Sequence, residues 1–120
     1  MAFADTPAPP YWAVLFTSRR NSGDAEGYAR MADAMSALAP SQPGYLGIES
    51  VRGADGVGIT VSYWRDEASI AAWKRLSAHV AAQQAGHERW YEDFVVRVAR
   101  VERAYTMAGS PREGLEPGEA

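Results

Sequence analysis

The sequence predicts an α+β domain of the ferredoxin-like kind, in which a β-α-β-β-α-β chain folds into a four-stranded antiparallel sheet. Three observations predict this class. Four short runs are rich in aromatic and β-branched residues, which favour strands. Two longer segments repeat apolar residues every three or four positions, as amphipathic helices do. A short glycine-containing turn joins the two middle runs, so the elements follow the split βαβ order and both helices are expected on one face of the sheet.

The first strand is predicted at residues 11–18, whose sequence YWAVLFTS follows a pair of prolines. A polar loop comes next, and Ser22 and Asp24 are candidates for the cap of a helix over residues 25–39. Pro40 is expected to end that helix, since proline lacks the amide hydrogen that a helix interior needs. One apolar stripe runs along the helix, formed by Tyr28, Met31, Ala32, Met35 and Leu38.

A hairpin is predicted from the strands at residues 45–52 and 59–64. Each run has a usual strand length. The connecting sequence RGADGVG contains Asp55-Gly56, a dipeptide that is typical of tight turns between antiparallel strands.

The second helix is expected to begin at Asp66 and Glu67, whose negative charges suit the positive end of a helix. Gly86 is expected to end it, because glycine readily adopts the left-handed conformation found at helix C-termini. A polar and aromatic connection, HERWYED, then leads to the last strand at residues 94–105. The buried stripe of the helix is predicted to be Ile70, Trp73, Leu76, Ser77 and Val80.

These elements make one domain over residues 11–105. Residues 1–10 and 106–120 are expected to be flexible tails, because both are rich in proline or glycine and offer little to bury. The chain of 120 residues is long enough to form a hydrophobic core without disulfide bonds.

The charge of the chain narrows the class of partner. Its net charge is −3 and its sequence pI is about 5.3, so no basic surface is expected for nucleic acid or an anionic membrane. Arg97, Arg100 and Arg103 form the only local basic cluster, and their spacing of three prevents them from sharing one strand face. Neither nucleic acid nor a membrane is therefore expected as a partner.

Cysteine is absent from the chain, which excludes disulfide bonds, cysteine nucleophiles and thiolate metal sites. No apolar run reaches the ~20 residues of a membrane span, and the N-terminus lacks the pattern of a signal peptide. A cytoplasmic protein is therefore expected.

The first and last strands are apolar on both faces. The first places Trp12, Val14 and Phe16 on one face, while Tyr11 and Leu15 lie on the other. The last strand likewise alternates apolar residues on both sides. The two helices cover one face, so we expect the other to be covered by a second copy of the chain, in a homodimer joined through the sheet faces.

Residues 62–91 hold three of the four tryptophans and both histidines. Such a cluster builds either a bulky core or a ligand cavity. Trp73 lies in the buried stripe of the second helix and is interpreted as core. Trp64 ends a strand face that is otherwise polar, which leaves room for a cavity beside it. Trp90 and Tyr91 precede the last strand, where aromatic side chains often close the mouth of a pocket.

His79 lies about 100° or more around the second helix from the centre of the stripe. Two interpretations are open: an ordinary histidine at the core boundary, or a ligand or acid–base group that lines a pocket between helix and sheet. His87 is expected to be solvated in a polar loop. Two histidines eight residues apart, without carboxylates at ligand spacing, do not predict a metal site. The serines do not lie in a nucleophile-elbow motif. The hairpin glycines do not form a dinucleotide-binding motif, because they lie in a turn between two strands with no helix after it.

Three stretches carry a resemblance to a known family: the hairpin, the segment ITVSYWRDEASIAAWKRLSAHVAAQQAG and the segment ERWYEDFVVRVARVERAY. Over residues 11–105 the chain resembles the antibiotic biosynthesis monooxygenase (ABM) family of dimeric α+β barrels, and within it the haem-degrading branch. The resemblance implies a homodimer joined through its sheets, with one pocket per subunit between helices and sheet. It also implies O2-dependent oxidation of an aromatic or phenolic substrate, or of haem, without flavin or a protein-held metal.

The resemblance also implies roles for individual residues. In the quinone-forming branch the protein supplies a base, a dry pocket and orientation. In the haem-degrading branch a histidine of the second helix ligates iron and a tryptophan presses on the macrocycle. His79 would be the base or iron ligand, and Trp64 the tryptophan that shapes the pocket. The haem-degrading members carry an asparagine on the first strand, whose hydrogen bond Thr17 or Ser18 would supply here.

The substrate-binding positions are expected to be Phe16, Ser18, Tyr63, Trp73, Gln83, Trp90 and Tyr91. No cofactor is expected to be built in, and haem enters as a substrate or ligand. Dimeric ferredoxin-like domains also serve as small-molecule sensors. A non-catalytic module that binds a small molecule or haem is therefore the alternative function.

Overall fold

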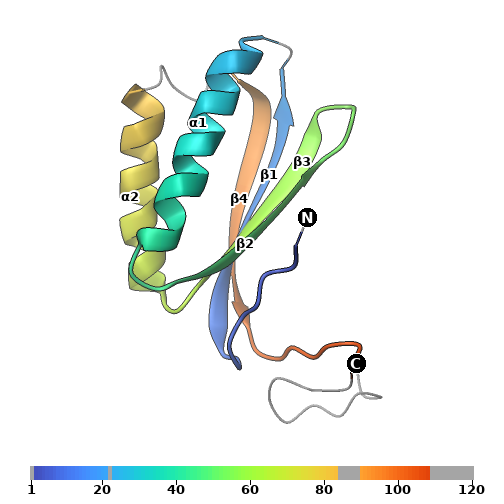
Figure 1. Cartoon of the computed structure of the whole chain (residues 1–120), viewed down its shortest axis with the longest axis vertical. Coiled ribbons are helices and arrows are strands. Elements are labelled where there is room, and N and C mark those ends of the chain that lie inside the picture. The colour runs from blue at the N-terminus through green and yellow to red at the C-terminus, as the bar shows by residue number, and fades with distance from the viewer. Residues whose placement is uncertain (1, 22, 84–89, 109–120) are drawn as a thin grey trace.

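The computed structural model describes residues 2–21, 23–83 and 90–108. Its strands form one antiparallel sheet in the order β2-β3-β1-β4, and both helices lie on the same side of it (Figure 1). The predicted ferredoxin-like fold is therefore confirmed. In chain order the elements are β1 (Tyr11–Arg20), α1 (Ala25–Leu38), the short 3₁₀ helix η1 (Ala39–Ser41), β2 (Tyr45–Arg52), β3 (Val57–Trp64), α2 (Glu67–Gln83) and β4 (Tyr91–Val101).

Three strands differ in length from the predictions, and strand pairing explains each difference. β1 continues past Ser18 to Arg20, because Arg20 pairs with Tyr91 at the start of β4. β3 begins at Val57, since β1 supplies it with a partner there. β4 ends at Val101 instead of residue 105, where its neighbour β1 begins. Tyr91 therefore belongs to a strand and not to the connection before it.

Asp24 caps α1, as the sequence predicted, from an uncommon backbone conformation. Its φ of 48° and ψ of 55° lie in the left-handed region, which Asp tolerates better than most residues. Its Oδ1 accepts a hydrogen bond from the Gly27 amide at 3.1 Å. A Cβ atom on Gly27 would lie 2.2 Å from Asp24 Oδ2, so this position has room only for glycine while the cap is in place.

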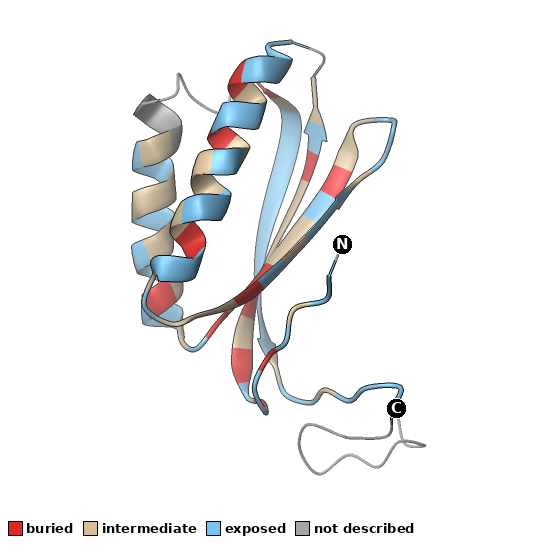
Figure 2. Cartoon of the chain, in the orientation of Figure 1, coloured by how far each residue is buried: buried red, intermediate tan, exposed pale blue. Residues whose placement is uncertain are grey.

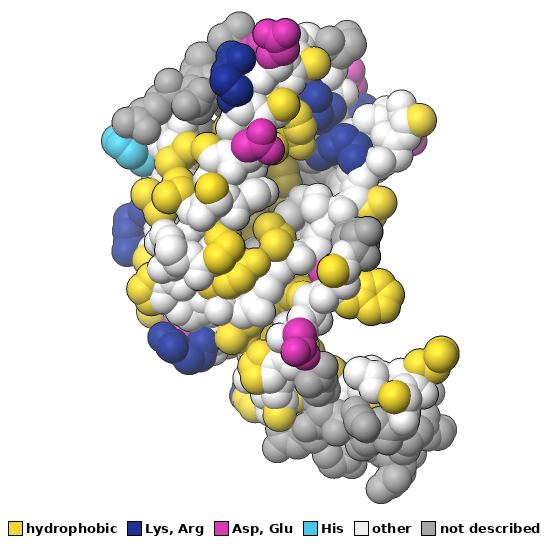
Figure 3. All heavy atoms as spheres, viewed as in Figure 1, with side chains coloured by type: hydrophobic (Ala, Val, Ile, Leu, Met, Phe, Trp, Pro, Cys, Tyr) yellow, Lys and Arg dark blue, Asp and Glu magenta, His cyan; other side chains and the backbone are white. Residues whose placement is uncertain are grey.

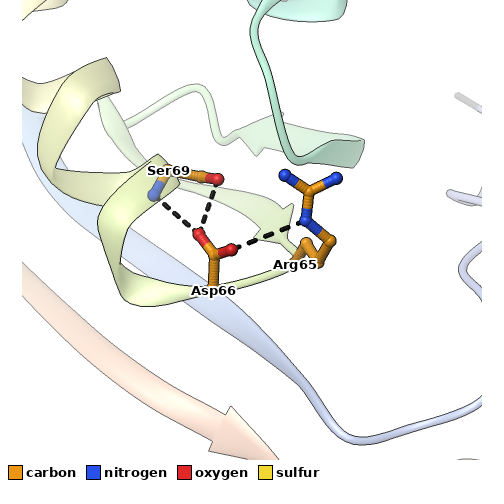
Figure 4. A network of polar contacts seen from close by, with 3 residues as sticks. All are labelled: Arg65, Asp66 and Ser69. Carbon is orange, nitrogen blue, oxygen red and sulfur yellow. Dashed lines mark hydrogen bonds and ion pairs between the residues drawn. The ribbon is translucent and has the colours of Figure 1, made fainter.

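Asp66 caps α2, whose start was predicted at Asp66 and Glu67 (Figure 4). Its Oδ1 accepts hydrogen bonds from the Ser69 amide at 2.8 Å and the Ser69 hydroxyl at 2.7 Å. These bonds, the hydroxyl's first, and then the nearby Arg65 lower the pKa of the Asp66 carboxyl. A Cβ atom on Gly44, whose φ is +81°, would lie 2.0 Å from Ser69 Oγ, so the start of β2 packs directly against this cap. The predicted helix end at Gly86 lies outside the described residues.

Strand register decides which side chains face the helices. Trp64 of β3 stacks on Trp73 of α2 with ring centroids 5.7 Å apart, so Trp64 and its cross-strand partners lie on the helix face of the sheet. The residues between them lie on the opposite face, here called the open face. Four cross-strand rows make up the helix face: Tyr45, Trp64, Trp12 and Arg100; Ile48, Ser62, Val14 and Val98; Ser50, Thr60, Phe16 and Val96; Arg52, Gly58, Ser18 and Phe94.

The segment before β1 lies against the open face of β2 and β3 (Figure 1). The Ala4 amide donates to Glu49 Oε2 at 3.0 Å, and the Tyr63 hydroxyl donates to the other oxygen of Glu49 at 2.7 Å. The Thr6 hydroxyl lies within hydrogen-bonding distance, 3.0 Å, of the Tyr11 hydroxyl. Tyr11, the first residue of β1, is buried, and its ring meets that of Tyr63 edge to face at 5.8 Å. The flexibility of the two tails stays a prediction.

β4 is exposed along its length (Figure 2). On the helix face Phe94 is 46% exposed and Val98 48%, while on the open face Val95 is 41% exposed. Arg97 pairs with Leu15 on the open face and Arg100 with a helix-face residue, so the arginines do not share one face, as predicted. An edge strand with apolar residues on both faces is the kind of surface that another chain covers.

No helix of the described residues combines the length and the apolar content needed to cross a membrane.

Candidate functional site

Small residues form the floor of the cleft on the helix face of β2 and β3. Three of them carry hydroxyl groups, Ser50, Thr60 and Ser62, and the fourth is Gly58. The hydroxyl oxygens of Ser50 and Thr60 are 2.6 Å apart. Ser50 is exposed and Ile48 is 38% exposed although both lie on the helix face. The floor is therefore open to solvent along β2, and Figure 3 shows this side of the molecule hollowed between α1 and the strands. We call this hollow the helix–sheet cleft.

One end of the cleft is closed by stacked aromatic rings. Trp64 stacks on Trp73 at an angle of 28° and meets the edge of Tyr45 with centroids 5.7 Å apart. Its indole Nε1 donates to Ser62 Oγ at 2.9 Å. Trp64 has no exposed surface, so a ligand atom cannot reach it while Trp73 keeps this position.

The other end of the cleft is also aromatic but less completely buried. The rings of Phe16 and Tyr91 meet edge to face at 5.4 Å, and Phe94 lies 5.5 Å from Phe16. Tyr28 of α1 meets the Tyr91 ring at 6.0 Å. Burial, and then the neighbouring Tyr28, raise the pKa of the Tyr91 hydroxyl well above its usual range, so it stays protonated at neutral pH.

Two arginines lie beside this aromatic end. The guanidinium of Arg20 stacks over the Tyr28 ring at 3.8 Å from its centroid, and that of Arg52 lies 5.9 Å from the same centroid. Arg52 donates to Ser18 Oγ at 2.8 Å and to the Ser18 carbonyl oxygen at 3.3 Å. A further hydrogen bond joins Arg52 to the carbonyl oxygen of Gly56. Positive charge is thus concentrated where β1, β2 and α1 meet.

Trp90 joins the start of β4 to the start of α1 through hydrogen bonds. Its indole Nε1 donates to Asp24 Oδ2 at 3.2 Å, and its carbonyl oxygen accepts from the Asn21 amide at 2.9 Å. Trp90 has no exposed surface. It therefore positions Tyr28 and Tyr91 and does not itself face the cleft.

The structure brings some of the predicted site residues together. Phe16, Ser18 and Tyr91 meet at the arginine end, with Trp90 beside them. Trp64 and Trp73 lie at the other end, six residues along β1 and hence ~20 Å away. The predicted set therefore occupies two ends of one cleft.

Other predicted residues lie elsewhere. Tyr63 is on the open face, because it is adjacent to Trp64 in a strand, and it bonds to Glu49 there. His79 is exposed on α2. The side chain of Gln83 lies outside the described part of the chain. Of the two candidates to replace an asparagine on β1, Ser18 is on the helix face and Thr17 is on the open face.

A small depression of about 140 Å³ lies at the edge of the open face between β1, β3 and β4. Its volume is well below the ~300 Å³ at which pockets for drug-sized ligands begin. We therefore place the candidate site in the helix–sheet cleft. The depression is lined by Thr17, Ser18, Arg19, Val57, Asp93, Phe94 and Val95.

The sequence reasoning missed Arg20, Arg52 and the role of Tyr28. Arg52 lies opposite Gly58 in the hairpin, but the third strand was predicted to begin only at residue 59. A hairpin register extended by two residues would have placed Arg52 beside the end of β1. The signal was therefore present in the turn, not in any basic cluster.

A family model described as antibiotic biosynthesis monooxygenase matches residues 13–85. The chain belongs to this ABM family. It is 51% identical over 98 residues to the uncharacterised protein YqjZ of Bacillus subtilis, a match that covers 82% of this chain and 85% of that protein. It is 29% identical over 94 residues to a jasmonate monooxygenase ABM of Pyricularia oryzae, covering 75% of this chain and 43% of that longer protein.

Solved structures share the ABM-like fold at low sequence identity. PA3566 from Pseudomonas aeruginosa superposes with a TM-score of 0.61 and 18% identity, covering 82% of this chain and 98% of that one. NE2512 from Nitrosomonas europaea gives a TM-score of 0.63 and 16% identity, covering 85% and 99%. These likenesses support the fold alone.

Proposed function

We propose that this protein is a monooxygenase that uses O2 to oxidise an aromatic or phenolic substrate in the helix–sheet cleft, without flavin or a protein-held metal. Membership of the ABM family and the relative named as a jasmonate monooxygenase support oxygenase chemistry. The cleft carries the proposal: its floor is open along β2, and one end is lined by Phe16, Tyr91 and Phe94. An aromatic molecule that enters along β2 meets these rings edge to face.

The reaction balances without an external reductant. A phenol loses the hydrogen of one ring carbon and its hydroxyl proton, gains one oxygen atom there, and becomes a quinone. The second oxygen atom leaves as water, so the four electrons that reduce O2 all come from the substrate. The protein then has to hold the substrate, take or hold a proton, and keep bulk water from the reacting carbon.

His79 and Trp64 are the proposed catalytic positions. His79 is exposed on α2, and its imidazole is the proposed base for the phenolic proton or, if haem is the substrate, the iron ligand. Trp64 is covered by Trp73, so it shapes the cleft through that stacked pair. Of the two, His79 is exposed and can contact a ligand directly, while Trp64 is fully buried and acts through Trp73.

The proposal includes a homodimer that joins through the sheet faces. On the open face Ile59 is 43% exposed and Val95 is 41% exposed. Ile59 belongs to the inner strand β3 and Val95 to the edge strand β4. Covering these side chains removes apolar surface from water, at roughly 25 cal/mol per Å². A second protomer is the proposed cover.

A second function is a non-catalytic module that binds a small molecule or haem. One observation favours it: the proposed base, His79, is exposed on α2, while the described lining of the cleft consists of hydroxyl groups and aromatic rings. Such a module keeps its ligand affinity when His79 is replaced.

Oxygen uptake by the purified protein separates these functions. A panel of phenols and quinols is supplied first, and haemin with a reductant is supplied second. The proposed enzyme consumes one O2 per quinone formed, and His79→Ala lowers that rate. A Soret shift of haemin that survives His79→Ala would exclude the iron-ligand role. Ligand binding with no oxygen uptake in either series would favour the binding module.

A further inference from the structure

Two arginine side chains come together over one tyrosine ring, and neither forms an ion pair among the described residues. The guanidinium carbons of Arg20 and Arg52 lie 3.8 Å and 5.9 Å from the centroid of Tyr28. Within residues 2–21, 23–83 and 90–108 neither arginine forms an ion pair with a carboxylate, and their hydrogen bonds there go to carbonyl oxygens and to the Ser18 hydroxyl. Two adjacent cations favour the binding of an anion at this end of the cleft. Figure 3 shows Lys and Arg side chains at the upper end of the molecule, with Asp and Glu side chains also at that end.

Gly58 allows Arg52 to reach this position. A Cβ atom on Gly58 would lie 2.9 Å from Arg52 Cζ, so the missing side chain lets Arg52 cross β3 over the floor of the cleft. Arg52 then bonds to the carbonyl and hydroxyl oxygens of Ser18 on β1. These bonds hold its guanidinium in one place, which lowers the entropic cost of binding an anion there.

Arg20 retains an unused hydrogen-bond donor. Its Nη2 donates to the Gly23 carbonyl oxygen at 3.1 Å, but its Nε is buried and has no acceptor among the described residues. Buried donors are normally paired, because an unpaired one loses its hydrogen bonds to water without replacement. Because this Nε is buried, an anion is expected to bind the terminal nitrogens of Arg20 and to supply the missing charge there.

An apolar strip begins next to the arginines. Arg52, Gly58, Ser18 and Phe94 form one cross-strand row, and the guanidinium of Arg52 reaches Ser18, whose strand is the direct neighbour of the strand that carries Phe94. Phe94 is 46% exposed and Val96, in the next row, is 50% exposed. The site thus has a cationic end and an uncovered apolar side.

We propose that Arg20 and Arg52 bind the carboxylate of an amphipathic monocarboxylic acid, whose apolar body lies along Phe16, Phe94 and Val96. This inference rests on the proposed function, since it names the substrate class of the same cleft. A carboxylate pairs with a guanidinium through two parallel hydrogen bonds and brings a single negative charge. Inorganic phosphate would satisfy the arginines but would leave the apolar strip uncovered, so the strip favours the carboxylic acid.

Isothermal titration calorimetry on the full chain tests the site with two probes of one skeleton, 4-phenylbutyrate and its uncharged amide. The acid is expected to bind about tenfold or more tightly than the amide, as charge-assisted pairs do. Arg20→Gln and Arg52→Gln are each expected to bring the two affinities close together. Arg19→Gln is the matched control, because Arg19 is exposed on the open face of the same strand, and it is expected to leave the ratio unchanged.

Equal affinities for acid and amide in the wild-type protein would overturn this inference, as would unchanged acid binding in both arginine variants. Displacement of the acid by an equal concentration of inorganic phosphate would show a phosphate site and would also overturn it. If Arg52→Gln does not fold, the ratio of acid to amide affinity in the wild-type protein and in Arg20→Gln still tests the inference.

Calorimetry measures binding without turnover, so the two proposals can fail separately. Acid binding without oxygen uptake contradicts the monooxygenase and supports the anion site. Oxidation of phenols at the same rate with and without a carboxylate contradicts the anion site and supports the monooxygenase.

Discussion

Trp90 donates a hydrogen bond from its indole Nε1 to Oδ2 of Asp24, 3.2 Å away and 66 positions earlier in the chain. The same carboxylate caps α1 through the Gly27 amide. One side chain therefore joins the start of α1 to the start of β4, and these two segments carry Tyr28 and Tyr91 to the aromatic end of the cleft. Trp90 is fully buried, so its Nε1 needs an acceptor inside the protein.

Asp24→Ala is expected to lower the free energy of unfolding by about 1–3 kcal/mol, because it removes both the helix cap and the acceptor for Trp90. Urea denaturation measures this change. Asp33→Ala, at an exposed position on the same helix, is the control and is expected to change stability by less than about 0.5 kcal/mol. Equal effects of the two substitutions would contradict the structural role of Asp24.

Gly27→Ala is expected to destabilise the protein even though alanine is the better helix former by ~1 kcal/mol. The new Cβ would lie 2.2 Å from Asp24 Oδ2 and displace the cap. Once the carboxylate is gone the clash is gone, so Gly27→Ala in the Asp24→Ala background is expected to stabilise. Urea denaturation of the four proteins in this double-mutant cycle measures the change of sign. The same sign in both backgrounds would show that the cap does not restrict position 27.

The cap of α2 predicts a pH dependence. Hydrogen bonds from Ser69 lower the pKa of Asp66 below its ordinary value of 3.8, so the folded state favours the ionised carboxyl. This contribution is complete above the unfolded pKa and is lost as the pH falls through the lower folded pKa. The difference in melting temperature between the wild type and Asp66→Asn is therefore expected to shrink on acidification from pH 6 to about pH 3. A difference in melting temperature that grows on acidification would contradict a lowered pKa of Asp66 in the folded state.

The exposed apolar residues of the open face predict the oligomeric state. Light scattering at micromolar concentration is expected to give twice the protomer mass of 13.0 kDa. Ile59→Lys is expected to yield the monomer, because a buried unpaired ammonium is costly. Ala37→Lys, on the exposed surface of α1, is the control and is expected to remain a dimer. A monomeric wild-type protein would remove the basis for a partner at the sheet.

Local sequence patterns predicted most of the fold. The two helices, the Asp55-Gly56 turn, the cap at Asp24 and the start of the second helix at Asp66 and Glu67 depend on neighbouring residues, and the structure has all of them. Strand ends were predicted less well, because a strand continues for as long as its neighbour supplies hydrogen bonds. Arg20 extends β1 because Tyr91 pairs with it, and no local pattern contains that pairing.

Only part of the candidate site was predicted, because the rest depends on strand pairing between distant segments. Phe16, Ser18 and Tyr91 were identified as aromatic or polar residues near strand ends, and the fold brings them together. Adjacent side chains of a strand point to opposite faces of the sheet. The sequence therefore already places Tyr63 on the other face from Trp64, which is the open face. The arginine pair was harder to predict, because beyond the hairpin register that places Arg52 opposite Gly58 it also depends on the pairing of β1 with β3.

The central claim is that this ABM-family protein inserts one atom of O2 into an aromatic substrate. The most direct measurement is mass spectrometry of the product formed from a phenol by the purified, chelator-treated protein under ¹⁸O₂. We expect a quinone that carries one ¹⁸O atom, with the other recovered in water, and less product with His79→Ala. A quinone that contains only ¹⁶O, or the absence of any product across the phenol panel, would contradict it.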